Sequence, residues 1–418
     1  MAEVITSLSR VTIISFILVF AVLDIILLVF RKNETVKEIF TIISYLLMYL
    51  FLVNGSIVVF LNTKDSRVIL LMFLQIVVFA GSTAFLKYYS KYFNGYLISN
   101  IYLLLSFSFV MLERLSMDKA IRQFIFAVVS LVVGSVVLIL ITKYKNFKYY
   151  YKWYFLAGIV LILAVLIFGA KEYGAKLSIN IFNISIQTSE FVKISFVFFL
   201  ASIIFVLRDI RGFIFSTVGT IIHVGILILC KDLGAALIFL VTYMFVVFVA
   251  YRKYVLFFGE IVLGILGGIL LYNLFPHVQT RFLAWSDPLS VVDNEGYQIC
   301  QSLFAIGTGD WLGLGLFQGQ PNKIPVVSKD FIFSAISEEL GCITALSLIV
   351  IILCTVIYIF IIAMDSSDSF YGLVSVGFGV IIATQAILNI GGVTKFIPST
   401  GVTLPLISYG GSSLLSLL

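Results

Sequence analysis

The sequence is poor in charged residues, and this shortage excludes a soluble globular protein. Aspartate, glutamate, lysine and arginine together make up 11% of the chain, whereas soluble domains carry about 25%. Hydrophobic residues make up 61%, and the mean hydropathy is +1.15. This composition indicates an all-α polytopic membrane protein, because apolar helices satisfy their own backbone hydrogen bonds in lipid.

Histidine and cysteine are also scarce, which limits the metal chemistry that the chain can support. The only two histidines, His223 and His277, argue against a histidine-based metal centre. The four cysteines form no CxxC pair and have no metal-ligand spacing, so we interpret them as small apolar side chains. No soluble segment carries a basic face with interleaved aromatic residues, and we therefore expect no nucleic-acid partner.

Proline is rare, and its positions mark the polar parts of the chain. Four of the six prolines lie in the interval 275–340, and Pro398 and Pro405 lie in a second polar interval, 394–409. Proline lacks the backbone donor that a helix needs. We therefore expect non-helical backbone, and any chemistry, in these two intervals. The first interval also carries Asp287, Asp293, Glu295, Asp310, Asp330, Arg281, Lys323 and Lys329.

Long apolar runs fill the rest of the chain, and each is long enough to cross a bilayer core of about 30 Å. They lie at 11–30, 39–61, 68–87, 96–112, 123–142, 153–170, 191–207, 213–230, 233–251, 255–275, 341–363 and 372–393. A thirteenth run begins near Gly410 and stops at Leu418, so we expect a truncated last helix.

Basic residues cluster in short loops of one parity, and this clustering predicts the orientation. The stretch 143–152 carries four lysines, and the loops at 31–37, 208–211 and 252–253 have the same parity. By the positive-inside rule these loops are cytoplasmic. Intervals 275–340 and 394–409 then lie outside. Between Gly174 and Gln187, isoleucines alternate with polar residues, a pattern that predicts a small β-hairpin on the same outer side.

Charged residues inside or at the ends of apolar spans are costly and call for a role. Glu190 and Lys193 are three residues apart and share one helical face, where they can form an ion pair. Asp232 precedes a span and is placed to cap its N-terminus. Asp24 and Glu260 lie within spans, and we expect both to pair across helices.

The glycine-rich run 307–319 does not have the context of a nucleotide-binding loop. It follows no predicted strand, lacks a Gly-Lys-Ser/Thr sequence and lies between membrane helices. We interpret it as a tightly packed re-entrant or surface segment. Two adjacent carboxylates, Glu338 and Glu339, precede Gly341 and exceed what a helix cap requires.

Several motifs occur in order along the chain. They are Ile186-Gln-Thr-Ser-Glu-Phe-Val-Lys193, Lys231-Asp-Leu-Gly234, Gly296-Tyr-Gln298 with Gln301-Ser302, Ala305-Ile-Gly307, Asp330-Phe-Ile-Phe-Ser-Ala-Ile-Ser-Glu-Glu-Leu-Gly341, Asn389-Ile-Gly391 and Leu404-Pro-Leu-Ile-Ser-Tyr-Gly-Gly-Ser-Ser413. From about residue 96 to the C-terminus, the chain resembles the SEDS family (shape, elongation, division and sporulation), which includes RodA, FtsW and SpoVE.

The resemblance implies a fold and an organisation. It predicts a SEDS-type bundle of about ten helices in residues 96–418, with a large extracytoplasmic loop at 276–340. Residues 1–95 would add three extra N-terminal transmembrane helices. Thr188 and Lys231 replace prolines of the family pattern, and Asp310 replaces a usual glycine.

The resemblance also implies a peptidoglycan glycosyltransferase that polymerises lipid II at the outer face of the cytoplasmic membrane. Its partner would be a class B penicillin-binding protein. A hydroxyl that attacks an anomeric carbon needs a base, and the departing pyrophosphate needs a cationic group or a divalent cation such as Mg or Mn. The prenyl tail needs an apolar groove. Elongation, division and sporulation roles share these motifs.

The catalytic aspartate that the resemblance implies has no direct counterpart in this sequence. Without a gap, the family position falls on Val291. A small register slip places Asp293 there, and Asp287 matches an upstream position that is often acidic. We rank Asp293 first and Asp287 second. The expected substrate-binding residues are Arg281, Glu190, Lys193, Gln298, Glu338, Glu339, Ser408 and Ser412, and no metal ligand is assigned.

Two other functions stay open at this point. A transporter that moves lipid II across the membrane would place its determinants at mid-membrane on interrupted helices, whereas all prolines lie in the polar intervals. A catalytically silent scaffold for a penicillin-binding protein is favoured by Val291.

Overall fold

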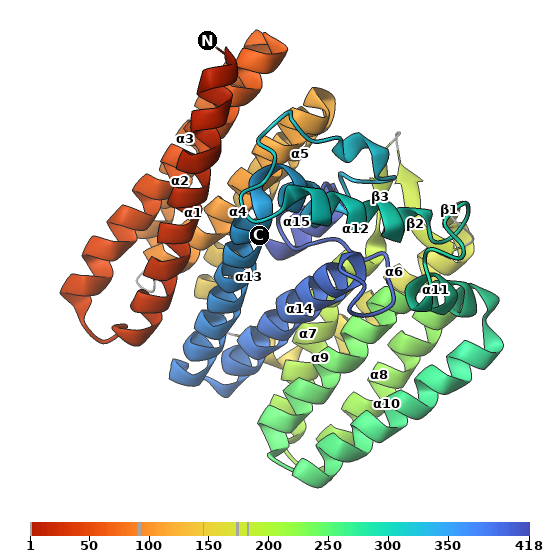
Figure 1. Ribbon diagram of the computed structural model, residues 1–418. Helices are drawn as coiled ribbons and strands as arrows, with labels where there is room; N and C mark the ends of the chain where they lie inside the picture. The colour runs from red at the N-terminus through yellow and green to blue at the C-terminus, as the bar shows by residue number, and fades with distance from the viewer. Residues whose placement is uncertain (1, 91–92, 145, 173–174, 182–183) are drawn as a thin grey trace.

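Helices dominate the computed structural model, which describes residues 2–90, 93–144, 146–172, 175–181 and 184–418 (Figure 1). The long helices are α1 (Ala2–Val29), α2 (Glu34–Thr63), α3 (Ser66–Tyr89), α4 (Gly95–Leu115), α5 (Met117–Lys143), α6 (Tyr151–Phe168), α7 (Thr188–Leu207), α8 (Ile210–Leu229), α9 (Leu233–Tyr251), α10 (Tyr254–Leu274), α13 (Ile332–Asp365) and α14 (Ser369–Val393). All twelve have the length and hydropathy of membrane spans. The twelve spans predicted from the sequence are confirmed.

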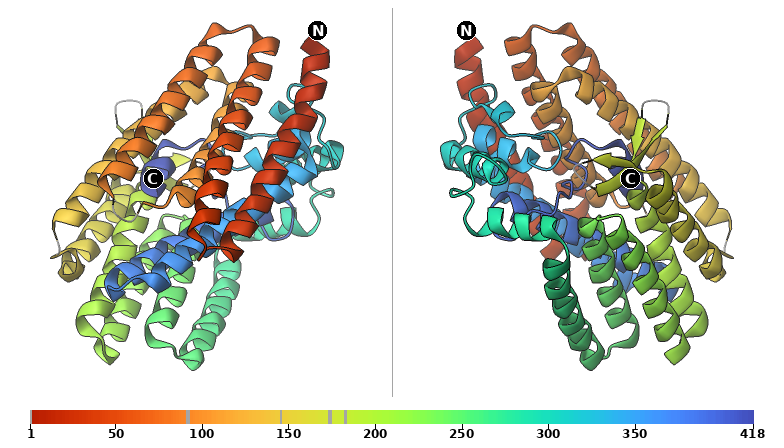
Figure 2. Two further views of the ribbon diagram at one scale, coloured as in Figure 1. Left: turned by 90° about the vertical axis from the view of Figure 1, so that its left-hand side faces the viewer. Right: turned by 90° about the vertical axis from the view of Figure 1, so that its right-hand side faces the viewer.

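Shorter elements connect the spans. They are η1 (Asn146–Tyr149), α11 (Pro276–Ser286), α12 (Tyr297–Gly309), η2 (Pro321–Lys323) and α15 (Gly411–Leu417). Helices α11 and α12 lie in the interval that the sequence marked as polar, and Pro276 occupies the first turn of α11, where its missing donor is tolerated. Figure 1 shows α11, α12 and the β-strands near one end of helices α8, α9 and α10, and Figure 2 shows the molecule from two opposite sides.

The three N-terminal helices pack on one side of the molecule and share its core (Figure 1). Helix α1 packs against α2 and α13, and α2 packs against α4. Phe20, Phe51, Phe107 and Leu348 belong to one buried apolar cluster, and the rings of Phe51 and Phe107 lie 4.5 Å apart. These helices are therefore packed into the bundle. The domain division at 95/96 stays a prediction.

Buried carboxyl groups join the N-terminal helices to the rest of the bundle. Asn100 Nδ2 donates to Asp24 Oδ2 at 2.9 Å and lies 3.1 Å from Thr355 Oγ1. This contact confirms that Asp24 pairs across helices, although its partner is a neutral amide.

Glu260 of α10 lies close to Tyr243 of α9, and among the described residues it has no cation within ion-pair distance.

The predicted hairpin belongs to a three-stranded antiparallel sheet in the order β1 (Ala170–Glu172), β2 (Ala175–Ile181), β3 (Ile184–Ile186). Strands β2 and β3 pair with Ile179 opposite Ile186, which confirms the hairpin. Residues 182–183, which separate these two strands, lie outside the described residues. Strand β1 was missed because it directly follows an apolar span.

Helix α13 begins nine residues before its predicted start and is broken at Gly341, where φ is +86° and ψ is 167°. The glycine-rich run passes through this break. Leu314 N donates to Glu338 O at 2.9 Å, and Cys342 N donates to Asp310 O at 2.9 Å. The run thus satisfies backbone groups that the break leaves free. The tightly packed segment predicted from the glycines is confirmed.

Candidate functional site

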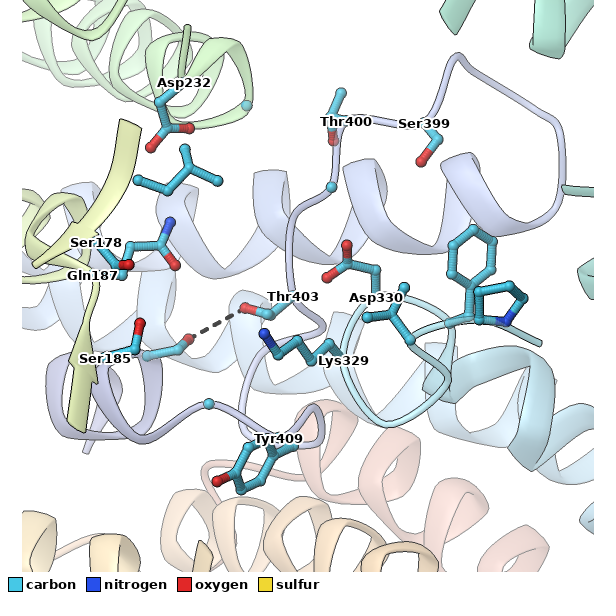
Figure 3. A pocket seen from close by; sticks show the side chains of 18 of the residues that line it. Ser178, Ser185, Gln187, Asp232, Lys329, Asp330, Ser399, Thr400, Thr403 and Tyr409 are labelled. Carbon is cyan, nitrogen blue, oxygen red and sulfur yellow. Dashed lines mark hydrogen bonds between the residues drawn. The ribbon is translucent and has the colours of Figure 1, made fainter. Parts of the chain in front are cut away.

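A cavity of about 1270 Å³ is lined by residues of both polar intervals. Its walls come from α5, the β-sheet, the start of α9, helices α11 and α12, and the segments 325–331, 399–403 and 409–415. Figure 3 shows Ser178, Ser185 and Gln187 on one side, facing Lys329, Asp330 and Thr403 on the other. Both polar intervals of the sequence therefore meet at one site.

Close backbone packing holds the walls of this cavity together. Gly401 has a φ of +71°, and an added Cβ at Gly234 would lie 2.7 Å from Val402 Cγ2. Asn389 Nδ2 donates to Asp330 O at 2.8 Å and to Val402 O at 2.7 Å. The amide of one helix thus fixes two segments that line the cavity.

Four cationic side chains line the cavity: Arg122, Lys231, Arg281 and Lys329. Arg281 Nη1 donates to Thr400 O at 3.0 Å. The surrounding walls desolvate the Arg281 guanidinium and lower its pKa, while Asp330 and Asp232 oppose this shift. This concentration of positive charge suits an anionic ligand such as a phosphate group.

Three carboxylates, Asp232, Glu295 and Asp330, line the same cavity. Asp232 Oδ1 accepts from Ala235 N at 3.1 Å, which confirms its predicted capping role, and Oδ2 accepts from Ser189 Oγ at 3.1 Å. Burial raises the pKa of Asp232. Burial also raises the pKa of Asp330, against the opposing effect of Lys329 and Arg281.

One wall of the cavity is apolar. Ile125, Phe126 and Val129 of α5 line it together with Leu415 of α15. Ile125 and Val129 are exposed, and α5 has the length and hydropathy of a membrane span. The cavity thus joins a cationic region to a surface suited to an alkyl chain.

The predicted ion pair lies beside the cavity, in a layer that adjoins Asp232. Lys193 Nζ is 2.6 Å from Glu190 Oε2, and both side chains are buried. Ser416 Oγ of α15 donates to the same Glu190 oxygen at 3.1 Å. The predicted Glu190–Lys193 pair is confirmed, and neither residue lines the cavity.

The structure brings together only some of the residues predicted to bind substrate. Arg281, Gln298 and Ser412 line the cavity. The Ser408 hydroxyl donates to Lys329 O and accepts from Leu404 N, so it ties the two polar intervals together. Among the described residues, neither Asp287 nor Asp293 lines the cavity.

Glu338 and Glu339 hold the long polar interval that precedes α13, and they do not line the cavity. Glu339 Oε1 accepts from Arg114 Nε at 3.0 Å and from Phe317 N at 3.1 Å. Glu338 Oε1 accepts from Gln320 N at 2.8 Å. These contacts with the preceding polar interval explain why two adjacent carboxylates, more than a helix cap requires, occur at this position.

Arg122, Lys329, Asp330, Glu295 and Tyr409 line the cavity but were not among the predicted site residues. Except for Arg122, they lie in the two polar intervals that the sequence marked. Their convergence depends on tertiary packing that no spacing reveals. Among the described residues, no group of three or more His, Cys, Asp or Glu is placed to hold a metal ion.

Fold and site define a multi-pass membrane protein with a cavity that combines cationic side chains with an apolar wall. Residues 92–418 match the family model for FtsW, RodA and SpoVE, described as cell cycle protein. The chain is 30% identical over 375 residues to the peptidoglycan glycosyltransferase RodA of Mycobacterium tuberculosis, covering 81% of this chain and 78% of that protein. It therefore belongs to the FtsW/RodA/SpoVE family, the SEDS family.

Further relatives and solved structures agree with this assignment. The probable peptidoglycan glycosyltransferase FtsW of Buchnera aphidicola is 37% identical over 270 residues, 62% of this chain and 67% of that protein. A chain in a structure of a peptidoglycan synthase complex matches with a TM-score of 0.64 and 24% identity, over 78% of this chain and 95% of that one. RodA of Thermus thermophilus matches with a TM-score of 0.56 and 22% identity, over 78% and 93%. The SEDS fold expected from the sequence is confirmed.

Proposed function

We propose that this protein is a peptidoglycan glycosyltransferase that polymerises lipid II at the outer face of the cell membrane. The observation that carries the proposal is the cavity, which combines four cationic side chains with an apolar wall on a membrane helix. Lipid II has the matching chemistry, a pyrophosphate between a sugar and a prenyl chain. Two relatives named as glycosyltransferases support the same activity.

The residues of the cavity suit the steps of this reaction. Arg281 and Lys329 are placed to bind the pyrophosphate and to stabilise the charge that develops as it leaves. Ile125 and Val129 offer a surface for the prenyl chain. The acceptor hydroxyl must lose a proton as it attacks, and a carboxylate in the cavity can accept it.

The partner that we propose is a class B penicillin-binding protein, a transpeptidase that would crosslink the new strands. Support comes from the similar chain in a complex that coordinates polymerization and crosslinking. Coupling of this kind requires both active sites on the same side of the membrane, and the cavity is lined by the two polar intervals that we expect on the outer side.

The test is lipid II polymerisation by the purified full-length chain, with its cognate penicillin-binding protein, followed by electrophoresis of the glycan strands. We expect strands from the wild-type protein. A RodA-type relative is run in parallel as the positive control. If the relative makes strands and this chain makes none, the glycosyltransferase proposal is wrong and a scaffolding role for the penicillin-binding protein takes its place.

A further inference from the structure

A closed turn in the long polar interval before α13 determines which of its acidic residues lies at the cavity. Asn294 N and Gly296 N both donate to Val291 O, at 3.1 and 2.9 Å. Gly296 is buried, and an added Cβ there would lie 2.2 Å from Pro288 O. A side chain at this position would clash with the backbone, so only glycine is accepted here. This close packing fixes the path of the chain into α12.

The turn places one of its acidic residues at the cavity. Glu295 lines the cavity beside Tyr297 and Gln298. Asp287 ends α11 and its carboxylate receives a hydrogen bond from Ser290 N at 3.4 Å. Asp287 and Asp293 are both exposed, and neither lines the cavity. Val291, also outside the cavity, has no group that could accept a proton.

Of the two other carboxylates of the cavity, Asp232 is committed to hydrogen bonds within the protein, and Asp330 lies in the electrostatic field of two of the cations. Both oxygens of Asp232 accept hydrogen bonds, from Ala235 N and Ser189 Oγ. Burial raises the pKa of Asp330, and Lys329 and Arg281 oppose this rise. We therefore assign Asp330 to the cationic region that is expected to bind the pyrophosphate. Glu295 is exposed to the cavity, so its carboxylate is open to an incoming hydroxyl.

We infer that Glu295 is the catalytic base of the loop, an inference that rests on the glycosyltransferase activity proposed above. Its carboxylate takes the proton of the acceptor sugar hydroxyl as that oxygen forms the new bond to the anomeric carbon of the donor. The bond from that carbon to the pyrophosphate oxygen breaks, and the electron pair leaves with the prenyl pyrophosphate. The proton ends on Glu295, and the reaction needs no further reactant.

The experiment compares wild-type protein with Glu295→Gln, Glu295→Asp, Asp293→Asn and Asp330→Asn in the lipid II polymerisation assay with the cognate penicillin-binding protein. For Glu295→Gln we expect the turnover rate to fall by about 10²–10⁴-fold, the usual contribution of a general base. KM for lipid II should change little, since the cations and the apolar wall are intact. Glu295→Asp should retain part of the rate, and Asp293→Asn should resemble wild type. The exposed Glu34→Gln, whose side chain is 82% exposed, controls for the loss of one carboxylate elsewhere.

Each outcome decides between the possibilities. Thermal unfolding in detergent establishes that Glu295→Gln folds as wild type does. If wild type is active and Glu295→Gln keeps its rate, the inference is wrong while the proposed activity stands. Loss of activity in Asp293→Asn or Asp330→Asn, with Glu295→Gln active, would move the base to that residue. If wild type is inactive beside an active relative, the proposed function fails and the role of Glu295 falls with it.

Discussion

Arg114 and Glu339 lie 225 positions apart in the sequence, yet Arg114 Nε is 3.0 Å from Glu339 Oε1. The Arg114 side chain is 10% exposed and that of Glu339 is fully buried. The guanidinium also lies 4.4 Å above the ring of Phe317. A single ion pair thus links the end of α4, the glycine-rich run and the broken helix α13.

Loss of this pair should destabilise the protein strongly. Arg114→Ala leaves the Glu339 carboxylate buried without its cation, and breaking a buried pair in this way costs about 3–5 kcal/mol. We expect a clear fall in the midpoint of thermal unfolding, measured in detergent. Arg211→Ala is the matched control, because its pair with Asp209 is largely exposed and should contribute about 0–1 kcal/mol. Equal effects of the two substitutions would contradict the structural role of the Arg114–Glu339 ion pair.

The break in α13 should depend on glycine at position 341. Gly341 has a φ of +86°, and an added Cβ would lie 2.3 Å from Gly313 N. Gly341→Ala combines unfavourable backbone geometry, about 1–3 kcal/mol, with a clash against rigid backbone. We expect low yield of folded protein by size-exclusion chromatography. Gly307→Ala is the control, since no atom lies within 4 Å of its added Cβ. A normal yield of folded Gly341→Ala would contradict the close packing of the glycine-rich run against the break in α13.

The membrane spans, the hairpin and the local pairs could be predicted because their signals are local. Hydropathy marked the spans, alternating isoleucines marked the hairpin, and spacing predicted both the Glu190–Lys193 pair and the Asp232 cap. The start of α13 could not be predicted in this way. Its first turns carry serines and two glutamates, which resemble loop composition, and tertiary contacts compensate for their burial.

The site could be predicted only as two polar intervals. Spacing within an interval says nothing about which side chains turn toward a common cavity. Glu295 and Asp293 are two residues apart, and the closed turn at Gly296 places only Glu295 at the cavity. Similarly, Arg114 and Glu339 each have an evident charge in the sequence, but their pairing depends on the packing of α4 against α13.

A buried carboxyl group should make the attachment of the N-terminal helices sensitive to polar substitutions. Ser56 Oγ and Gln75 Nε2 each lie 3.0 Å from an oxygen of Glu113 on α4. Gln75→Leu removes one donor and leaves the carboxyl group under-satisfied, a loss of about 1–3 kcal/mol. We expect a lower midpoint of thermal unfolding. Adding Glu113→Leu should recover part of the loss, because the unpaired polar group is then gone; an additive double variant would argue against the contact.

The pH dependence of stability should include a contribution from His277. Burial, Arg281 and Lys231 lower the pKa of His277 below its ordinary value of 6.5. The unfolded chain therefore binds this proton more readily than the folded protein. Unfolding becomes easier as the pH falls below about 6.5. His277→Gln should weaken this part of the decline, measured as thermal midpoints from about pH 7.5 to 5. An unchanged profile would show that the cationic surroundings of His277 have no effect on stability.

Removing Arg281, one of the cations that line the cavity, should reduce activity more than stability. Arg281 Nη1 donates to Thr400 O at 3.0 Å, and Asp330 acts electrostatically on the guanidinium. If this group stabilises the departing pyrophosphate, Arg281→Ala should lower lipid II turnover by about 10²–10³-fold. Arg281→Lys keeps the charge but loses the fork geometry of the guanidinium, so its turnover rate should lie between those of the wild type and Arg281→Ala. Lys323→Ala, an exposed cation outside the cavity, should behave as wild type. Equal losses in Arg281→Ala and Lys323→Ala would instead point to a general effect of net charge on the binding of an anionic lipid.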